Sequence, residues 1–163
     1  MTKILLLSDT HSYIDDRILE YAANADEVWH AGDFGVNVAE QLEKIAKVRG
    51  VFGNIDNDFI RKEYPETSFF KCENVKVLMI HIGGYPARYT ALAKKEILKH
   101  QPKLFISGHS HILKVMNDNA NNLLHINPGA AGKVGWHQTR TMLKFEIDGD
   151  TIQNLEIVDF GAK

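Results

Sequence analysis

The sequence predicts an α/β (α+β) fold in which two β-sheets pack face to face and helices cover the outside. In the first half, strands and helices alternate as β-α-β-α-β, which favours parallel strands with right-handed crossovers. The first strand is a continuous apolar run, typical of a strand covered on both faces. The last third instead consists of strands joined by turn residues, which predicts antiparallel pairing.

The elements of the first half follow from hydrophobic periodicity and helix-start signals. The amphipathic helix expected over residues 37–48 places Val38, Leu42, Ile45 and Ala46 on one stripe. From the N-terminus, we expect a strand at 3–8, a helix at 15–25, a strand at 27–32, this helix at 37–48, and a third strand at 50–54.

The second half begins with two strands over residues 67–82, which turn at Glu73–Asn74. A helix over 87–100 is stopped by Pro102. The remaining strands are expected at 103–108, 113–118, 121–129, 139–148 and 151–160. The layout is therefore parallel in its first half and antiparallel at its end, within one domain over residues 1–163.

Composition excludes several classes of protein. The 163 residues are 44% hydrophobic and 25% charged with a net charge of −2, so we expect neither a membrane anchor nor a long nucleic acid as partner. The single Cys72 cannot form an internal disulfide. The apolar run before Ser8 is too short for a signal peptide or a membrane span. We therefore expect a cytoplasmic protein; a secreted protein lacking its signal is the alternative.

Five hydrophobic runs end in side chains that can bind a metal. The stretch "LLLSDTH" ends in an acid, a hydroxyl and an imidazole, where a strand reaching the surface needs only a turn former. Ligands bind beyond the carboxyl ends of the strands in open α/β sheets, so we expect these groups to meet. The candidate ligands are Asp9, His11, Asp33, Asn54, His81, His109 and His111.

Each of these side chains alone has a structural explanation. Asp9 could cap a helix, His81 or His109 could be a core or rim histidine, and Asn54 could simply form a turn. Their joint occurrence at five strand ends favours a metal site.

Spacing supports the same interpretation. In "D-T-H" and "H-S-H" the ligands are two residues apart, so in an extended chain they point the same way and could share one ion or bridge neighbouring ions. Gly32, Gly53 and Gly108 directly precede ligands, where a missing side chain lets the backbone approach closely or bend.

Seven ligands are too many for one ion of usual coordination, so two ions sharing Asp33 is the economical arrangement. Two divalent ions against Asp9 and Asp33 leave net positive charge that attracts a phosphate. Imidazole-rich, thiolate-free ligation suits transition metals better than Mg or Ca. We expect Mn first, with Ni, Fe, Zn and Co as the other candidates.

The motifs "D-T-H", "G-D", "G-N", a His after a buried strand and "G-H-S-H" resemble the calcineurin-like metallophosphoesterase superfamily. The short chain and the late "INPGAAG" resemble its small YfcE-type phosphodiesterase branch, and the resemblance runs from residue 4 to about 145. It implies a metallophosphoesterase-like sandwich that hydrolyses a small phosphate ester by in-line attack of a metal-bridging hydroxide.

The resemblance also implies roles for the seven candidate ligands, all of which we expect to be catalytic. Asp9, His11 and His111 would hold one metal, and Asn54, His81 and His109 the other, with Asp33 bridging. Asn54 and His81 are also expected to contact the substrate.

Two departures from the family pattern stand out. Many members have a His after "G-N" as a proton donor to the leaving group, and this chain has Ile55. Acidic, phenol-like leaving groups should therefore be favoured over alkoxides. His81 is followed by Ile82 rather than by Gly, which affects the loop expected over the second metal.

Five further polar residues lie in or near these motifs. We expect His30 to pack beneath the site and Asn127 to be a turn residue at its rim. His137 and Arg140 are expected in a solvated loop, and contact with a substrate phosphate is the alternative. Asp56 could orient a ligand histidine or start the next turn. The alternatives to an enzyme are a catalytically weak scaffold and a metal- or nucleotide-binding protein of the same fold; a homodimer stays open.

Overall fold

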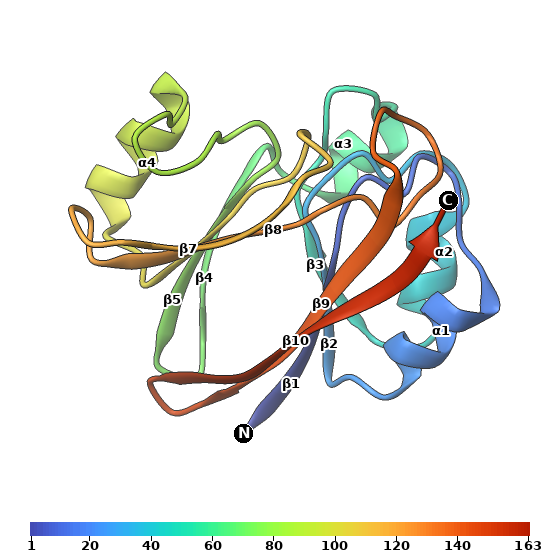
Figure 1. The fold of residues 1–163 in the computed structure, drawn as a ribbon, viewed down its shortest axis with the longest axis horizontal. Helices are drawn as coiled ribbons and strands as arrows, with labels where there is room; N and C mark the ends of the chain where they lie inside the picture. The colour runs from blue at the N-terminus through green and yellow to red at the C-terminus, as the bar shows by residue number, and fades with distance from the viewer.

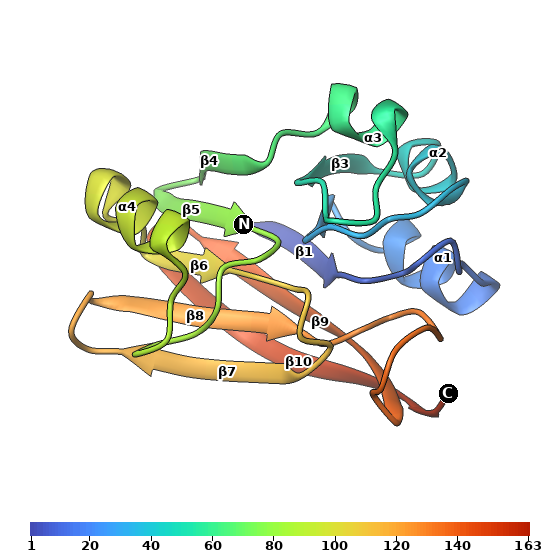
Figure 2. The same ribbon diagram turned by 90° about the horizontal axis from the view of Figure 1, so that it is seen from above.

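The computed structural model describes residues 1–163 as two mixed β-sheets packed face to face, with the helices outside (Figure 1, Figure 2). One sheet has the strand order β10-β9-β1-β2-β3 and the other β4-β5-β6-β8-β7, which confirms the predicted two-sheet fold. No helix is long and apolar enough to cross a membrane. The elements are β1 (Thr2–Leu7), α1 (Asp16–Ala23), β2 (Glu27–His30), α2 (Val38–Glu43), β3 (Lys47–Gly50), α3 (Asp58–Glu63), β4 (Thr67–Cys72), β5 (Val75–Ile80), α4 (Ala91–His100), β6 (Leu104–Ile106), β7 (Leu113–Asp118), β8 (Leu123–Pro128), β9 (Thr139–Asp148) and β10 (Thr151–Ala162).

Strand β1 lies at the centre of the first sheet, parallel to β2 and antiparallel to β9. Its side chains alternate: Ile4 and Leu6 enter the core between the two sheets, and Leu5 and Leu7 enter the core that contains residues of α1 and α2. Both faces are therefore buried, which explains the unbroken apolar run. This rigid strand fixes the position of the segment that follows it.

The second sheet is built on the predicted hairpin. β4 and β5 pair antiparallel with Cys72 opposite Val75, and Glu73 makes the turn with φ +50°. α4 packs Ala93 and Ile97 into a cluster with β-strand residues of this sheet. In this sheet β6 pairs parallel with both β5 and β8, so these three strands end at the same edge. β1, β2 and β3 are likewise parallel in the first sheet. The carboxyl ends of both sets of strands can therefore lie at one end of the sandwich.

The structure differs from the predicted elements in five main places. It contains α3, a helix that the sequence did not predict, and α4 begins at Ala91 rather than at residue 87. The helix expected over 37–48 ends at Glu43, because residues 47–50 form β3 beside β2; Ile45, expected on the buried stripe, is 40% exposed. Residues 51–54, expected as a strand, form the loop that carries Asn54. The strand expected at 121–129 in the antiparallel region pairs parallel with β6 on one side.

Candidate metal centre

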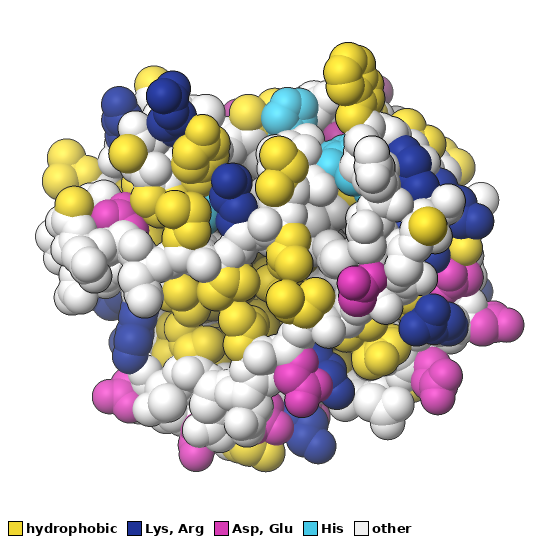
Figure 3. Space-filling view, viewed as in Figure 1, with side chains coloured by type: hydrophobic (Ala, Val, Ile, Leu, Met, Phe, Trp, Pro, Cys, Tyr) yellow, Lys and Arg dark blue, Asp and Glu magenta, His cyan; other side chains and the backbone are white.

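All seven candidate ligands lie in the segments that follow parallel strands. The segments after β1, β2, β3, β5 and β6 meet at one end of the sandwich, at the top of Figure 1. In the same view, Figure 3 shows His side chains at the surface of this end. Asp9, Asp33 and His81 are buried, whereas Asn54 and His109 are exposed. The site therefore has a buried floor and an open side.

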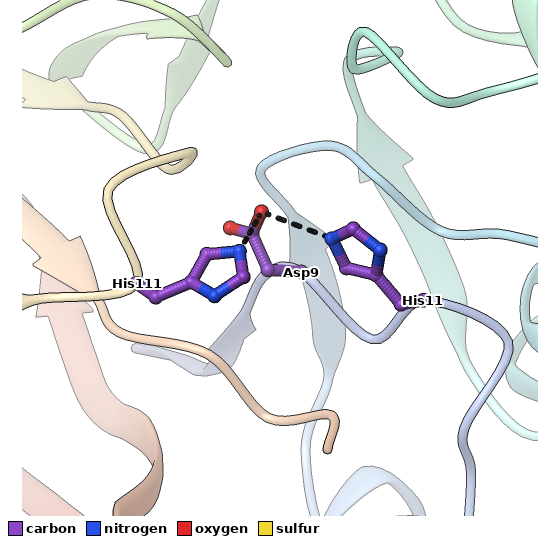
Figure 4. Close-up of side chains that lie close together, drawn as sticks. All are labelled: Asp9, His11 and His111. Atoms are coloured by element: carbon purple, nitrogen blue, oxygen red, sulfur yellow. Dashed lines mark ion pairs between the residues drawn. The ribbon is translucent and has the colours of Figure 1, made fainter. Parts of the chain in front are cut away.

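Six of the seven side chains form two groups, each able to hold an ion. Within each group the ligand atoms lie within 4.8 Å of one another: Asp9, His11 and His111 in the first, and Asp33, His81 and His109 in the second. In the first group, Nε2 of His111 is 3.1 Å and Nε2 of His11 is 3.7 Å from Oδ1 of Asp9. Figure 4 shows both rings directed at this carboxylate oxygen.

Oδ2 of Asp33 links the two groups most closely, whereas Oδ1 of Asp9 reaches His81 of the second group only at 3.8 Å. Oδ2 of Asp33 lies 3.3 Å from Nε2 of His11 in the first group and 3.2 Å from Nε2 of His81 in the second. Asn54 completes the second group, with its Oδ1 3.1 Å from Nδ1 of His109.

The unused atoms of the site fit a cation. Oδ1 of Asp9 and the Nε2 atoms of His11 and His81 are buried without any hydrogen-bond partner. Each such atom costs about 1–3 kcal/mol when left unsatisfied. The opposite atoms are occupied: Oδ2 of Asp9 accepts from the Ser8 hydroxyl at 2.5 Å, and Nδ1 of His81 lies 2.7 Å from the Ala31 carbonyl. The open atoms are therefore the ones that face the centre, as metal ligands require.

The two carboxylates hold positive charge at the centre. Burial alone raises the pKa of Asp9, but the imidazoles of His11 and His111 beside this carboxylate outweigh burial and keep its pKa well below its usual range. The pKa of Asp33 is lowered in the same way by His11 and His81. Asp33 and then Asp9 raise the pKa of His11 to about 9. A divalent ion can replace these protons.

Five of the seven candidate ligands have a left-handed backbone, which costs non-glycine residues about 1–3 kcal/mol each. Their φ angles are +54° at Asp9, +45° at His11, +58° at Asp33, +68° at His109 and +62° at His111. The extended chain expected for the two-residue spacings is therefore wrong. The "D-T-H" pair enters one group, whereas the "H-S-H" pair is divided between both.

The glycines before the ligands allow close approach, as the sequence predicted. A Cβ on Gly32, which has φ +105°, would overlap the ring of His81. A Cβ on Gly53 would overlap the Asp33 carboxylate. Each of these loops is thus packed directly against a ligand from another loop.

Asp56 has a role that differs from both alternatives left open by the sequence. Its carboxylate accepts hydrogen bonds from the backbone N–H groups of Asp33 at 2.9 Å, Gly53 at 2.8 Å and Gly35 at 3.0 Å. Asp56 is 5% exposed and so ties the loop of Asp33 to the loop of Asn54. The donors of Asp33 and Gly35 come from another loop, so only the tertiary structure brings them to Asp56.

His30 packs beneath the site, as predicted. Its ring stacks on Phe34 with centroids 3.7 Å apart, and both ring nitrogens are used: Gly32 N donates to Nδ1, and Nε2 lies 3.0 Å from Oγ1 of Thr10. Burial lowers the pKa of His30 to about 3. His30 is therefore a neutral structural residue.

Three other predictions need correction or refinement. Arg140 is not in a solvated loop: it lies buried in β9, donates to the Ala131 carbonyl at 2.7 Å and stacks on Tyr13. His137 is half-buried against His111. Asn127 is buried one residue before the end of β8, and it donates to the Gly108 carbonyl at 3.0 Å, so it supports the "G-H-S-H" loop.

The chain resembles known proteins in sequence and in fold. Residues 2–150 match the calcineurin-like phosphoesterase superfamily domain. A probable metallophosphoesterase of Mycoplasma pneumoniae is 31% identical over 137 residues, which cover 80% of this chain and 79% of that protein.

Two solved structures share the fold. Vps29 from Entamoeba histolytica in complex with zinc has a TM-score of 0.73 at 20% identity, covering 98% of this chain and 99% of that one. A predicted phosphoesterase from Streptococcus pneumoniae has a TM-score of 0.72 at 21% identity, covering 97% and 89%.

Proposed function

The chain belongs to the calcineurin-like phosphoesterase superfamily, and we propose that it is a phosphodiesterase with a two-metal centre. One observation carries the proposal. Oδ2 of Asp33 lies 3.3 Å from a histidine of the first group and 3.2 Å from a histidine of the second. Both histidine nitrogens are buried and have no hydrogen-bond partner in the protein. A bridging carboxylate between two ions accounts for both facts.

In this proposal, Asp9, His11 and His111 hold the first ion, and Asn54, His81 and His109 hold the second, with Asp33 shared. Two divalent ions at this position would lower the pKa of a water bound between them and stabilise charge on the oxygens of the phosphate. The donors are imidazole, carboxylate and amide, which suit Mn first, and also Ni, Fe, Zn or Co.

The chain's own residues orient the reaction. Hydrogen bonds fix the carboxylates in one rotation: Ile55 N holds Oδ1 of Asp33 at 3.0 Å, which directs Oδ2 to the centre. Asn54 is exposed at the open side, where we propose that it and His81 contact the phosphate ester. We propose that the substrate is a small phosphate ester.

The residue available to protonate the leaving group distinguishes this chain from many members of the superfamily. Position 55 contributes its backbone N–H to Asp33, but the Ile55 side chain, 46% exposed, cannot donate a proton. We therefore propose that diesters with acidic, phenol-like leaving groups are hydrolysed faster than alkyl esters.

Hydrolysis of bis-p-nitrophenyl phosphate beside p-nitrophenyl phosphate tests the proposal. The metal-stripped protein is assayed with Mn, Ni, Zn or Mg added back in turn. Metal-dependent turnover of the diester, faster than that of the monoester, is the expected result. Asp33→Asn should lose both ions and nearly all turnover; an active, metal-replete variant would refute the bridging role.

Two bound ions without turnover of either ester would instead favour a scaffold or a metal- or nucleotide-binding protein of the same fold. The complete set of seven candidate ligands favours the enzyme, because a pure scaffold has no need to keep them.

A further inference from the structure

His137, which the sequence predicted in a solvated loop, lies against a candidate ligand of the first group. It belongs to the loop between β8 and β9, and its Nδ1 is 3.1 Å from Nδ1 of His111. The two rings meet edge to face, with centroids 4.9 Å apart. On its other side, Nε2 of His137 is 2.8 Å from the Gly132 carbonyl.

These contacts determine where the protons lie. The Gly132 carbonyl can only accept, so Nε2 of His137 carries the hydrogen and Nδ1 of a neutral ring carries a lone pair. Nδ1–H of His111 then donates to that lone pair. His111 is left with a bare Nε2, the atom that lies 3.1 Å from Oδ1 of Asp9 and can ligate an ion.

The acceptor carbonyl is itself tied to the site. Gly132 N donates to the Asp9 carbonyl at 3.1 Å, so the contacts close a ring from Asp9 through His111, His137 and Gly132 back to Asp9. The loop also passes close over the ligand, since a Cβ on Gly135 would overlap the ring of His111.

The second group does not use this ring of contacts. His81 is oriented directly by the Ala31 carbonyl, and His109 contacts Asn54. The two groups therefore differ in what orients their histidines.

We propose that His137 is a positioning residue that holds His111 in the ligand tautomer and so sets the ion affinity of the first group. The inference rests on the two-metal centre proposed above. Loss of such an outer partner typically weakens metal binding about 10- to 100-fold.

The test is ion binding to the full, metal-stripped chain, measured by calorimetry with Zn and with Mn. His137→Leu removes the acceptor, whereas His137→Asn retains an amide oxygen near the position of Nδ1. His111→Ala and His109→Ala identify which binding step belongs to which group. We expect the leucine variant to lose about 10- to 100-fold in the first-group step alone, and the asparagine variant to recover most of it.

Three results would overturn the inference: no change in the leucine variant, an equal loss in both steps, or a first-group loss that asparagine does not reduce. Thermal unfolding of the metal-free variants shows whether the loop still folds. Because binding is read without substrate, a lack of hydrolysis would overturn the proposed activity and leave this inference standing.

Discussion

Replacing Asp56 with alanine should loosen the loops that carry Asp33 and Asn54. The change removes a buried acceptor from three backbone N–H groups, of Asp33, Gly53 and Gly35. A hydrogen bond to a charged group contributes about 1.5–3 kcal/mol, and two of the three are fully buried. Since water can reach the vacated site and replace part of this, we expect the free energy of unfolding to fall by about 3–5 kcal/mol.

Two further variants sharpen this prediction. Asp56→Asn keeps one oxygen for the bonds at Oδ2 but sets an NH₂ group against Gly35 N–H, so its loss should be intermediate. Asp58→Ala is the matched control, because Asp58 is an exposed acid in the first turn of α3 and contributes only about 0.3–1 kcal/mol through the helix dipole.

Urea unfolding of the metal-free proteins, followed by circular dichroism, measures all three. Ion binding by the variants that remain folded is the second readout, because both groups depend on these loops. The proposed role of Asp56 in holding the two loops together is wrong if the free energies of unfolding of Asp56→Ala and Asp58→Ala differ by less than about 1 kcal/mol and Asp56→Ala binds two ions normally.

Three other changes have expected outcomes. Gly32→Ala should weaken ion binding at the second group at least about tenfold, because its methyl group overlaps His81 at a backbone φ of +105°; calorimetry measures this, and normal affinity would contradict it. Ile55→His should speed esters with poor leaving groups more than those with good ones, and a uniform effect across a series of aryl and alkyl diesters would count against the missing-acid argument. Burial lowers the pKa of His125 from 6.5 to about 4, so the unfolded chain takes up a proton first, and stability should fall by about 3 kcal/mol as the pH drops from 6.5 to 4. His125→Met should reduce that fall in urea unfolding at the two pH values, and an unchanged pH dependence would exclude His125 as its source.

The sequence by itself determined most of the strands and pointed to the candidate ligands. The apolar run of β1 requires two covered faces, and the polar residues after five such runs point to one edge, whatever the details of the loops. These are local patterns with a period of two or 3.6, and they survive folding unchanged. The end of α2 was missed because residues 45–48 continue the helical pattern, while pairing of β3 with β2 takes the chain into the sheet.

Only the tertiary structure decided how the site is assembled. The family resemblance assigned His109 and His111 to different ions, but the left-handed backbone angles with which their loop presents them appear only in the folded chain. The long-range partners of Asp56 and His137 are 21–26 residues away in the chain and meet them only after folding. A single Asp or His in a loop carries no periodic signal, so its hydrogen-bond partners are set by which loops the packed sheets bring together.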